Sequence, residues 1–130
     1  MSKEVGITAF RSQCPVAASL DLLGDKWSLV IVRDLMIRKR RYKDFQDSPE
    51  GIPTNILANR LRKLEEDGII KKHPYQEKPV RHEYSLTCKG ADLLPVLQQL
   101  ALWGHKYIPE SWSPPDWFLN AKPGELPVEK

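Results

Sequence analysis

The stretch from Ile52 to Tyr84 constrains the fold more than any other part of the chain. Leucines recur in its first half at spacings of four and three residues, which predicts an amphipathic helix. Pro53 suits the first position of this helix, and Gly68 suits its end, where a left-handed residue is favoured. Two short segments of strand-forming residues follow, separated by a polar turn. We therefore expect a capped helix followed by a β-hairpin.

The outer face of this helix is polar. Asn55, Asn59 and Arg62 fall opposite the leucines, and Thr54 precedes them. Amide and guanidinium groups are the side chains that read base edges in the major groove of DNA. An ordinary amphipathic helix with a solvated face is the alternative, and this one helix does not exclude it.

The neighbouring segments predict an α+β class and a winged helix-turn-helix arrangement. A short helix, a turn that contains Pro and Gly, the amphipathic helix and a hairpin follow one another in that order. A long last helix has too broad an apolar stripe for one neighbour, and Pro95 is expected to kink it. Beyond it, prolines predict an extended segment that runs over the domain or over a partner chain, with Trp112, Trp117 and Phe118 packed there. The expected helices span 15–23, 26–37, 42–47, 53–67 and 88–107, and the expected strands span 69–75 and 81–86.

Positive charge is concentrated around the opening stretch. Residues 35–89 contain 13 basic and 8 acidic side chains, whereas the whole chain has a net charge of only +3. Such a segment fits a polyanion such as DNA. A solvated basic loop is the alternative for residues 38–41, and an internal ion pair is the alternative for Arg60. The predicted phosphate contacts are Arg38, Arg40, Arg41, Lys43, Arg60, Lys63, and Lys78 and Arg81 of the wing.

Other classes of protein find little support in the sequence. No apolar run is long enough to span a membrane, so no membrane partner is expected. Two cysteines are too few for a disulfide framework, which predicts a cytoplasmic protein. The three histidines are scattered and no Cys/His cluster has zinc-ligand spacing, so we expect no metal, no cofactor and no enzyme activity.

The sequence resembles the HxlR-type winged-helix transcriptional regulators of bacteria, relatives of the MarR group. Pro53 stands where this family often has a Ser or Thr that caps the recognition helix, so Thr54 is the alternative cap. The matching residues are Cys14-Pro15-Val16, Leu22-Leu23-Gly24-Asp25-Lys26-Trp27, Arg33-Asp34-Leu35, Arg41-Tyr42, Gly51-Ile52, Arg60-Leu61, Leu64-Glu65-Glu66-Asp67-Gly68, Glu83-Tyr84-Ser85-Leu86-Thr87, Gly90, Leu94-Pro95-Val96-Leu97 and Trp103-Gly104.

This resemblance implies a homodimer that binds a palindromic operator in double-stranded DNA, with one recognition helix in each half-site. It also implies that the first and last helices form the dimer contact. The expected organisation is an N-terminal arm over 1–13, a winged-helix domain with its dimerisation helices over 14–107, and a Pro/Trp-rich extension over 108–130.

Two hypotheses concern regulation. Cys14 precedes a helix, where a thiol is activated, and some family members sense quinones, aldehydes or oxidants through a similar cysteine. The alternative for Cys14 is a small buried capping residue, and Cys88 is a weaker candidate. The second hypothesis is a small-molecule effector in a pocket near Trp27 and Trp103, with no redox role for Cys14.

Overall fold

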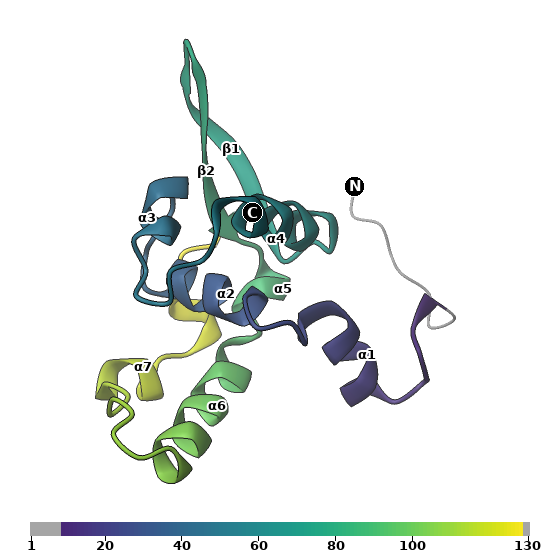
Figure 1. The fold of residues 1–130 in the computed structure, drawn as a ribbon, viewed down its shortest axis with the longest axis vertical. Helices are drawn as coiled ribbons and strands as arrows, with labels where there is room; N and C mark the ends of the chain where they lie inside the picture. The colour runs from purple at the N-terminus through teal and green to yellow at the C-terminus, as the bar shows by residue number, and fades with distance from the viewer. Residues whose placement is uncertain (1–8, 129–130) are drawn as a thin grey trace.

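The computed structural model describes residues 9–128, which form helices around the base of a two-stranded wing (Figure 1). The wing projects away from the helices, and α6 lies at the opposite end of the molecule. The elements in chain order are α1 (Pro15–Leu23), α2 (Ser28–Met36), α3 (Tyr42–Gln46), α4 (Thr54–Glu66), β1 (Ile70–Glu77), β2 (Val80–Leu86), α5 (Cys88–Ala91), α6 (Leu94–Tyr107), α7 (Asp116–Asn120) and the 3₁₀ helix η2 (Pro123–Glu125).

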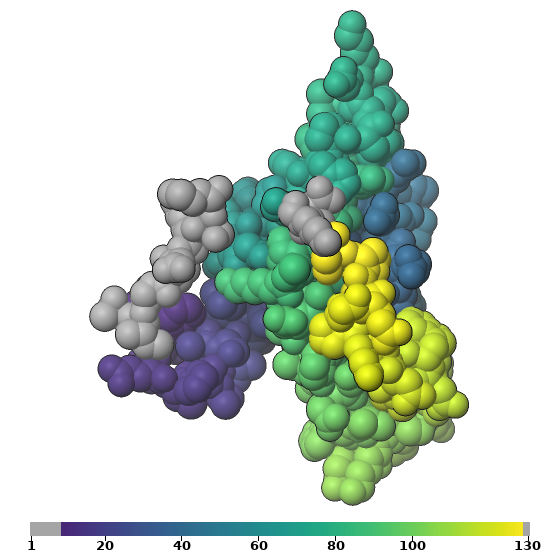
Figure 2. Space-filling model, turned by 180° about the vertical axis from the view of Figure 1, so that it is seen from behind, coloured from purple at the N-terminus to yellow at the C-terminus, as the bar shows by residue number. Residues whose placement is uncertain are grey.

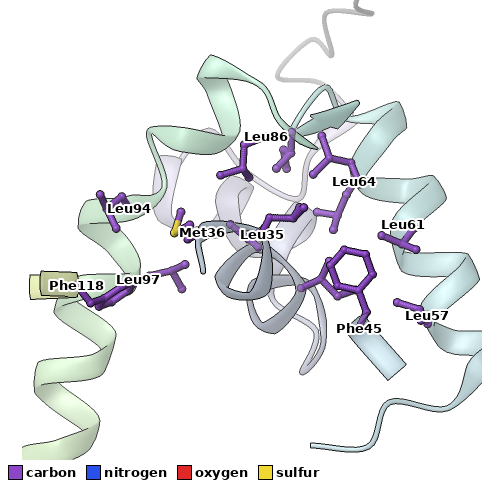
Figure 3. Packing of buried hydrophobic residues seen from close by; sticks show 14 residues of the cluster. Leu35, Met36, Phe45, Leu57, Leu61, Leu64, Leu86, Leu94, Leu97 and Phe118 are labelled. Atoms are coloured by element: carbon purple, nitrogen blue, oxygen red, sulfur yellow. The ribbon is translucent and has the colours of Figure 1, made fainter. Parts of the chain in front are cut away.

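The core lies between α2, α4 and the base of the wing. Leu57, Leu61 and Leu64 form the predicted stripe of α4 and are each at most 2% exposed. They surround Phe45 of α3 and face Leu35 of α2 (Figure 3). Each such side chain contributes about 1.5–3 kcal/mol through its removal from water. This packing determines which face of α4 remains exposed.

The start of α4 differs from both predictions for it. Pro53 has φ −62° and ψ 143°, so it is the residue before the helix, and its carbonyl accepts the N–H of Leu57 at 2.9 Å. Thr54 is therefore the first helical residue and not the cap. Pro53 is not the first helical residue because its ψ is extended rather than helical, so the helix begins only after it. At the other end Gly68 has φ +75°, which confirms its predicted left-handed role.

The wing is an antiparallel pair in which Ile70 lies opposite Leu86. The strands run further toward the turn than the sequence predicted, so that Glu77 pairs with Val80. A register irregularity at Tyr75 interrupts the ladder and turns this ring outward.

The prediction of one continuous helix over 88–107 is wrong. This segment is divided into α5 and α6 by the turn at Asp92–Leu93. Pro95 explains the division, because it lies in the first turn of α6, where its missing N–H needs no partner. Thr87 caps α5 as expected, since its side chain accepts the N–H of Gly90 at 3.1 Å.

The segment after α6 folds back over the body of the molecule toward the base of the wing (Figure 2). Phe118 of α7 is buried against the core, and Gln98 of α6 donates to the carbonyls of Phe118 and Ala121 at 2.9 and 2.8 Å. Val128 forms a parallel bridge to Leu86. Trp112 and Trp117 do not pack over the domain, because they are 82% and 56% exposed, which leaves the predicted alternative of a contact with a partner chain. The short α7 turns only one aromatic ring of its pair inward.

Helix α1 stands apart from this body and has no buried residue (Figure 1). It begins and ends as predicted, at Pro15 and before Gly24. Most of the predicted N-terminal arm over 1–13 lies outside the described residues, as do residues 129–130. Among the described helices, none is both long and apolar enough to cross a lipid bilayer.

Candidate nucleic-acid interface

The exposed face of α4 has the composition that the sequence predicted. Thr54, Asn55, Asn59 and Arg62 are all exposed on it. Arg62 faces Glu66 one turn later at 4.0 Å, but both side chains are about two-thirds exposed. Such an exposed pair contributes at most about 1 kcal/mol and is easily exchanged for another partner. The face therefore offers two amides and one weakly held guanidinium.

The first turn of α4 is attached to α3. The hydroxyl of Tyr42 donates to the carbonyl of Thr54 at 2.8 Å, and the amide of Gln46 donates to the Thr54 hydroxyl at 3.4 Å. Helix α3 itself begins where the carboxylate of Asp44 accepts the N–H groups of Arg40 and Arg41. The N–H of Arg41 is the main cause that lowers the pKa of Asp44. These bonds give α3, the turn and α4 a defined helix-turn-helix geometry.

The basic loop before α3 is partly neutralised within the chain. Arg40 and Arg41 approach Glu83 of β2 at 4.0 and 3.7 Å, and Arg41 also stacks on the ring of Tyr75 at 3.7 Å. The Tyr84 N–H donates to the Arg40 carbonyl at 2.7 Å. Both arginine side chains are still about half exposed. The loop is thus held against the wing with its guanidinium groups accessible, and the sequence contained no signal for Glu83 as their common partner.

Arg60 forms an internal ion pair, which was the predicted alternative to a contact with phosphate. Its Nε is 3.3 Å from the carboxylate of Asp25, and its side chain is 32% exposed. Asp25 also accepts the N–H groups of Trp27 and Ser28 at 2.9 Å. It is nevertheless not the cap residue that the sequence predicted, because α2 begins two residues later than expected, at Ser28, with Trp27 in the cap position. Arg60 therefore connects the start of α2 to α4. Lys63 faces the buried Asp67 at 3.1 Å, but its own side chain is 44% exposed.

The other predicted phosphate contacts lie on exposed positions. Lys78 and Arg81 flank the tip of the wing, and Lys43 on α3 faces Asp47 at 3.5 Å with both side chains exposed. Lys71 and Lys72 on β1 are also exposed. The sequence pattern included them in the positive charge of residues 35–89 but did not predict them as phosphate contacts. Helix α3, α4 and the wing lie next to one another in the half of the molecule opposite α6, so the elements that carry these cations are neighbours of α4 (Figure 1).

Cys14 lies immediately before α1, as predicted, but it is exposed rather than buried. The backbone N–H groups of Ala17 and Val16 lower the pKa of its thiol, although none makes a hydrogen bond of normal geometry to the sulfur. Arg11 does not assist it, because its side chain pairs with Asp21. Cys88 at the start of α5 is exposed as well.

The structure does not bring Trp27 and Trp103 together in one pocket, as the effector hypothesis predicted. Trp27 borders a small cavity of about 10 Å³ under the turn before α4. Trp103 is not part of its lining, because it lies on the outer face of α6, 61% exposed, with its ring 5.5 Å from that of Tyr107. A space of this size holds about one water molecule, so the cavity is too small for an organic effector. Within residues 9–128 no group of three acidic, Cys or His side chains is placed to hold a metal ion.

The sequence profile of the HxlR-like helix-turn-helix family matches residues 22–112, which include the whole helix-turn-helix and the wing. The chain belongs to this family. A Mycobacterium tuberculosis relative, named an HTH-type transcriptional regulator, is 39% identical over 100 residues. The match covers 77% of this chain but only 63% of that relative. The Bacillus subtilis regulator YdeP is 38% identical over 94 residues, which are 72% of this chain and 73% of YdeP. These relatives are named as regulators, not as enzymes, as the sequence predicted for this chain.

Solved structures of similar proteins show the same fold. PA1607 has a TM-score of 0.70 and 42% identity over 78% of this chain and 72% of its own. The redox regulator HypR, in its oxidised form, has a TM-score of 0.66 and 35% identity over 72% of this chain and 96% of its own. The transcriptional regulator YodB from Bacillus subtilis, in its reduced form, has a TM-score of 0.62 and 31% identity over 77% and 99%. The winged helix-turn-helix architecture is thereby confirmed.

Proposed function

We propose that this HxlR-like protein is a sequence-specific DNA-binding transcriptional regulator. The observation that carries the proposal is the exposed polar face of α4, with Asn55, Asn59 and Arg62 in one row beside a basic wing. Asn pairs with adenine and Arg with guanine through two hydrogen bonds each. The relatives named as transcriptional regulators support the same conclusion.

The proposed contacts divide into two groups. Asn55, Asn59 and Arg62, together with Thr54, read base edges and determine sequence preference. A ring of cations binds phosphate and supplies affinity that falls with salt. Arg60 is left out of this ring, because Asp25 already holds it. The ring consists of Arg40, Arg41, Lys43, Lys63, Lys78 and Arg81.

The active form is a homodimer on a palindromic operator. Val96, Leu100, Trp103 and Tyr107 recur on α6 at spacings of four, three and four residues, and all are 46–61% exposed. A row with this spacing is typical of a helix that packs on another helix. The dimer would place the two copies of α4 one turn of DNA apart, about 34–36 Å.

The test replaces two base-reading side chains. Duplexes are first selected from a random pool by the wild-type protein, and affinity is then measured by fluorescence anisotropy. Asn59→Ala with Arg62→Ala should weaken binding to the selected duplex by at least about 30-fold, because two base contacts are lost. Asn120→Ala with Lys122→Ala is the matched control, since it removes an exposed amide and an exposed cation near the other end of the chain. Unchanged affinity of the first variant would show that the reading face is misassigned.

A second function, a thiol switch at Cys14, is favoured by the exposure of this thiol and by its lowered pKa. The thiolate adds to an electron-poor ring carbon of an electrophile such as a quinone and forms a C–S bond, while the displaced C=C electron pair moves to the quinone oxygen, which takes up a proton from water. HypR, a relative named as a redox regulator, has been solved in both oxidised and reduced forms, which supports a similar role here. Modification at the end of α1 would shift the contact between the two subunits and so the spacing of the two reading helices.

Alkylation by iodoacetamide tests this switch. Because the pKa of Cys14 lies below the ordinary value of 9.0, its alkylation rate should reach half-maximum at a lower pH than that of free cysteine. The fast reaction should persist in the Cys88→Ser variant and disappear in Cys14→Ser. The alkylated protein should also bind its selected duplex at least about fivefold more weakly, a coupling of about 1 kcal/mol. A slow Cys14, or unchanged affinity after alkylation, would rule the switch out.

A further inference from the structure

Arg33 of α2 forms a two-pronged contact with the turn that leads into α4. Its Nη1 and Nη2 atoms donate to the two carboxylate oxygens of Glu50 at 2.7 and 2.8 Å. This contact holds the pKa of the Glu50 carboxyl below its ordinary value. Only three residues separate Glu50 from the first helical residue, Thr54, and one of them is Gly51 with φ +66°. The position of Glu50 therefore limits where α4 begins.

A second contact holds the same turn from below. Asp34, next to Arg33, is 1% exposed and accepts hydrogen bonds from Arg33 Nη2 at 2.7 Å and from the Ser48 hydroxyl. The Ser48 hydroxyl in turn accepts a bond from Lys39 Nζ at 2.6 Å. A buried carboxylate must be satisfied by such partners, so this arrangement does not move freely.

The Arg33–Glu50 contact is better suited to orientation than to stability. Both side chains are about one-third exposed, and ion pairs near the surface stabilise a fold only slightly. A fork-to-carboxylate pair, however, fixes both distance and direction. It joins α2, which is packed in the core, to a turn whose other end is held by Tyr42 at Thr54.

From this geometry we infer that Arg33 is a positioning residue, which sets the direction of the first turn of α4 through Glu50. The inference rests on the proposed function, because it concerns how Asn55 and Asn59 reach the bases. Arg33 touches no DNA. Arg33 determines whether the amides of α4 reach hydrogen-bonding distance of the base edges, so it governs the sequence preference of the protein. It does not change the attraction between the cations and the DNA phosphates.

The experiment compares two affinities of the full chain. The probes are a duplex selected from a random pool by the wild-type protein and a scrambled duplex of the same composition. Glu50→Gln keeps the size of the side chain but removes the two-pronged acceptor, and Arg33→Lys keeps the charge but removes the fork. Glu125→Gln is the matched control, since Glu125 is an exposed carboxylate in η2.

Both variants should lower the ratio of the two affinities by about tenfold, as the loss of one good base contact would. Binding to the scrambled duplex and its dependence on salt should stay within about twofold of wild type, because the cations are intact. A ratio within twofold of wild type in Glu50→Gln would overturn the inference, as would an equal loss on both duplexes. If the wild-type protein selects no sequence at all, the proposed function fails first. Glu50→Gln decides the matter if Arg33→Lys folds poorly.

Discussion

Gly90 of α5 lies against the backbone of Ile69, the residue just before β1. A Cβ atom built on Gly90 would be 2.2 Å from the carbonyl oxygen of Ile69 and 3.0 Å from the side chain of Leu86. The same carbonyl also accepts the N–H and the hydroxyl of Thr87, at 3.1 and 3.0 Å. The absence of a side chain at this one position thus allows α5 to close over the base of the wing.

Replacement of Gly90 by Ala should destabilise the fold by about 1–3 kcal/mol, because the backbone must move to admit the methyl group. Urea unfolding measured by circular dichroism is the test. Gly124→Ala is the control, because nothing lies within 4 Å of its Cβ position and its effect should be small. Equal midpoints for the two variants would contradict the close contact.

At the scale of elements, the short helix α7 shows how an extension is attached to a domain. Its two aromatic neighbours point to different environments, since Phe118 is 8% exposed and Trp117 is 56% exposed. Phe118 lies beside Leu94 and Leu97 of α6 (Figure 3). Gln98 then binds the backbone around it. One buried ring and one amide therefore attach α7 to α6.

Phe118→Ala should lower the free energy of unfolding by about 3–5 kcal/mol, the range for removal of a buried ring. Trp117→Ala removes a larger side chain but one that is mostly in water, so its effect should be below about 1 kcal/mol. Thermal unfolding of both variants separates them. A larger loss for Trp117→Ala than for Phe118→Ala would show that the segment packs differently.

At the scale of the whole molecule, charge and apolar surface are separated. The wing, α3 and α4, which carry the cations and the polar face, lie toward one end of the molecule, whereas α6, which carries exposed apolar side chains, lies at the other end (Figure 1). Helix α1 adds Val16 and Leu20, which are 68% and 53% exposed. Apolar surface of this kind marks a contact with another protein chain, and a second copy is the partner proposed above.

Leu100→Glu should convert the dimer into a monomer, because it places a charge within the proposed contact. Sedimentation equilibrium measures the change in mass, and affinity for the selected duplex should fall at least about tenfold as one half-site contact is lost. Leu102→Glu is the matched control on the same helix, about 200° around it, and should remain dimeric. A wild-type protein that stays monomeric at micromolar concentration, or a dimeric Leu100→Glu variant, would contradict the proposed contact.

Periodicity and capping residues made much of the fold predictable. The leucine stripe of α4, the left-handed Gly68 and the cap at Thr87 all depend on neighbours within a few residues. The polar face of α4 followed from the same local pattern, because a helix with one buried face exposes the other. The boundary at Pro53 was missed by one residue, and the break before Pro95 was predicted only as a kink.

The pairs that shape the site could not be predicted in this way, since their partners lie far apart in the chain. Arg60 with Asp25, Arg41 with Glu83 and Arg33 with Glu50 are separated by at least 17 residues. Which cation meets which acid depends on how α2, α4 and the wing pack, and charge alone does not specify it. The sequence by itself determined that α4 would present amides and a guanidinium to solvent. Only the tertiary structure decided which of the surrounding cations remain available for DNA, because internal carboxylates hold some of them in place.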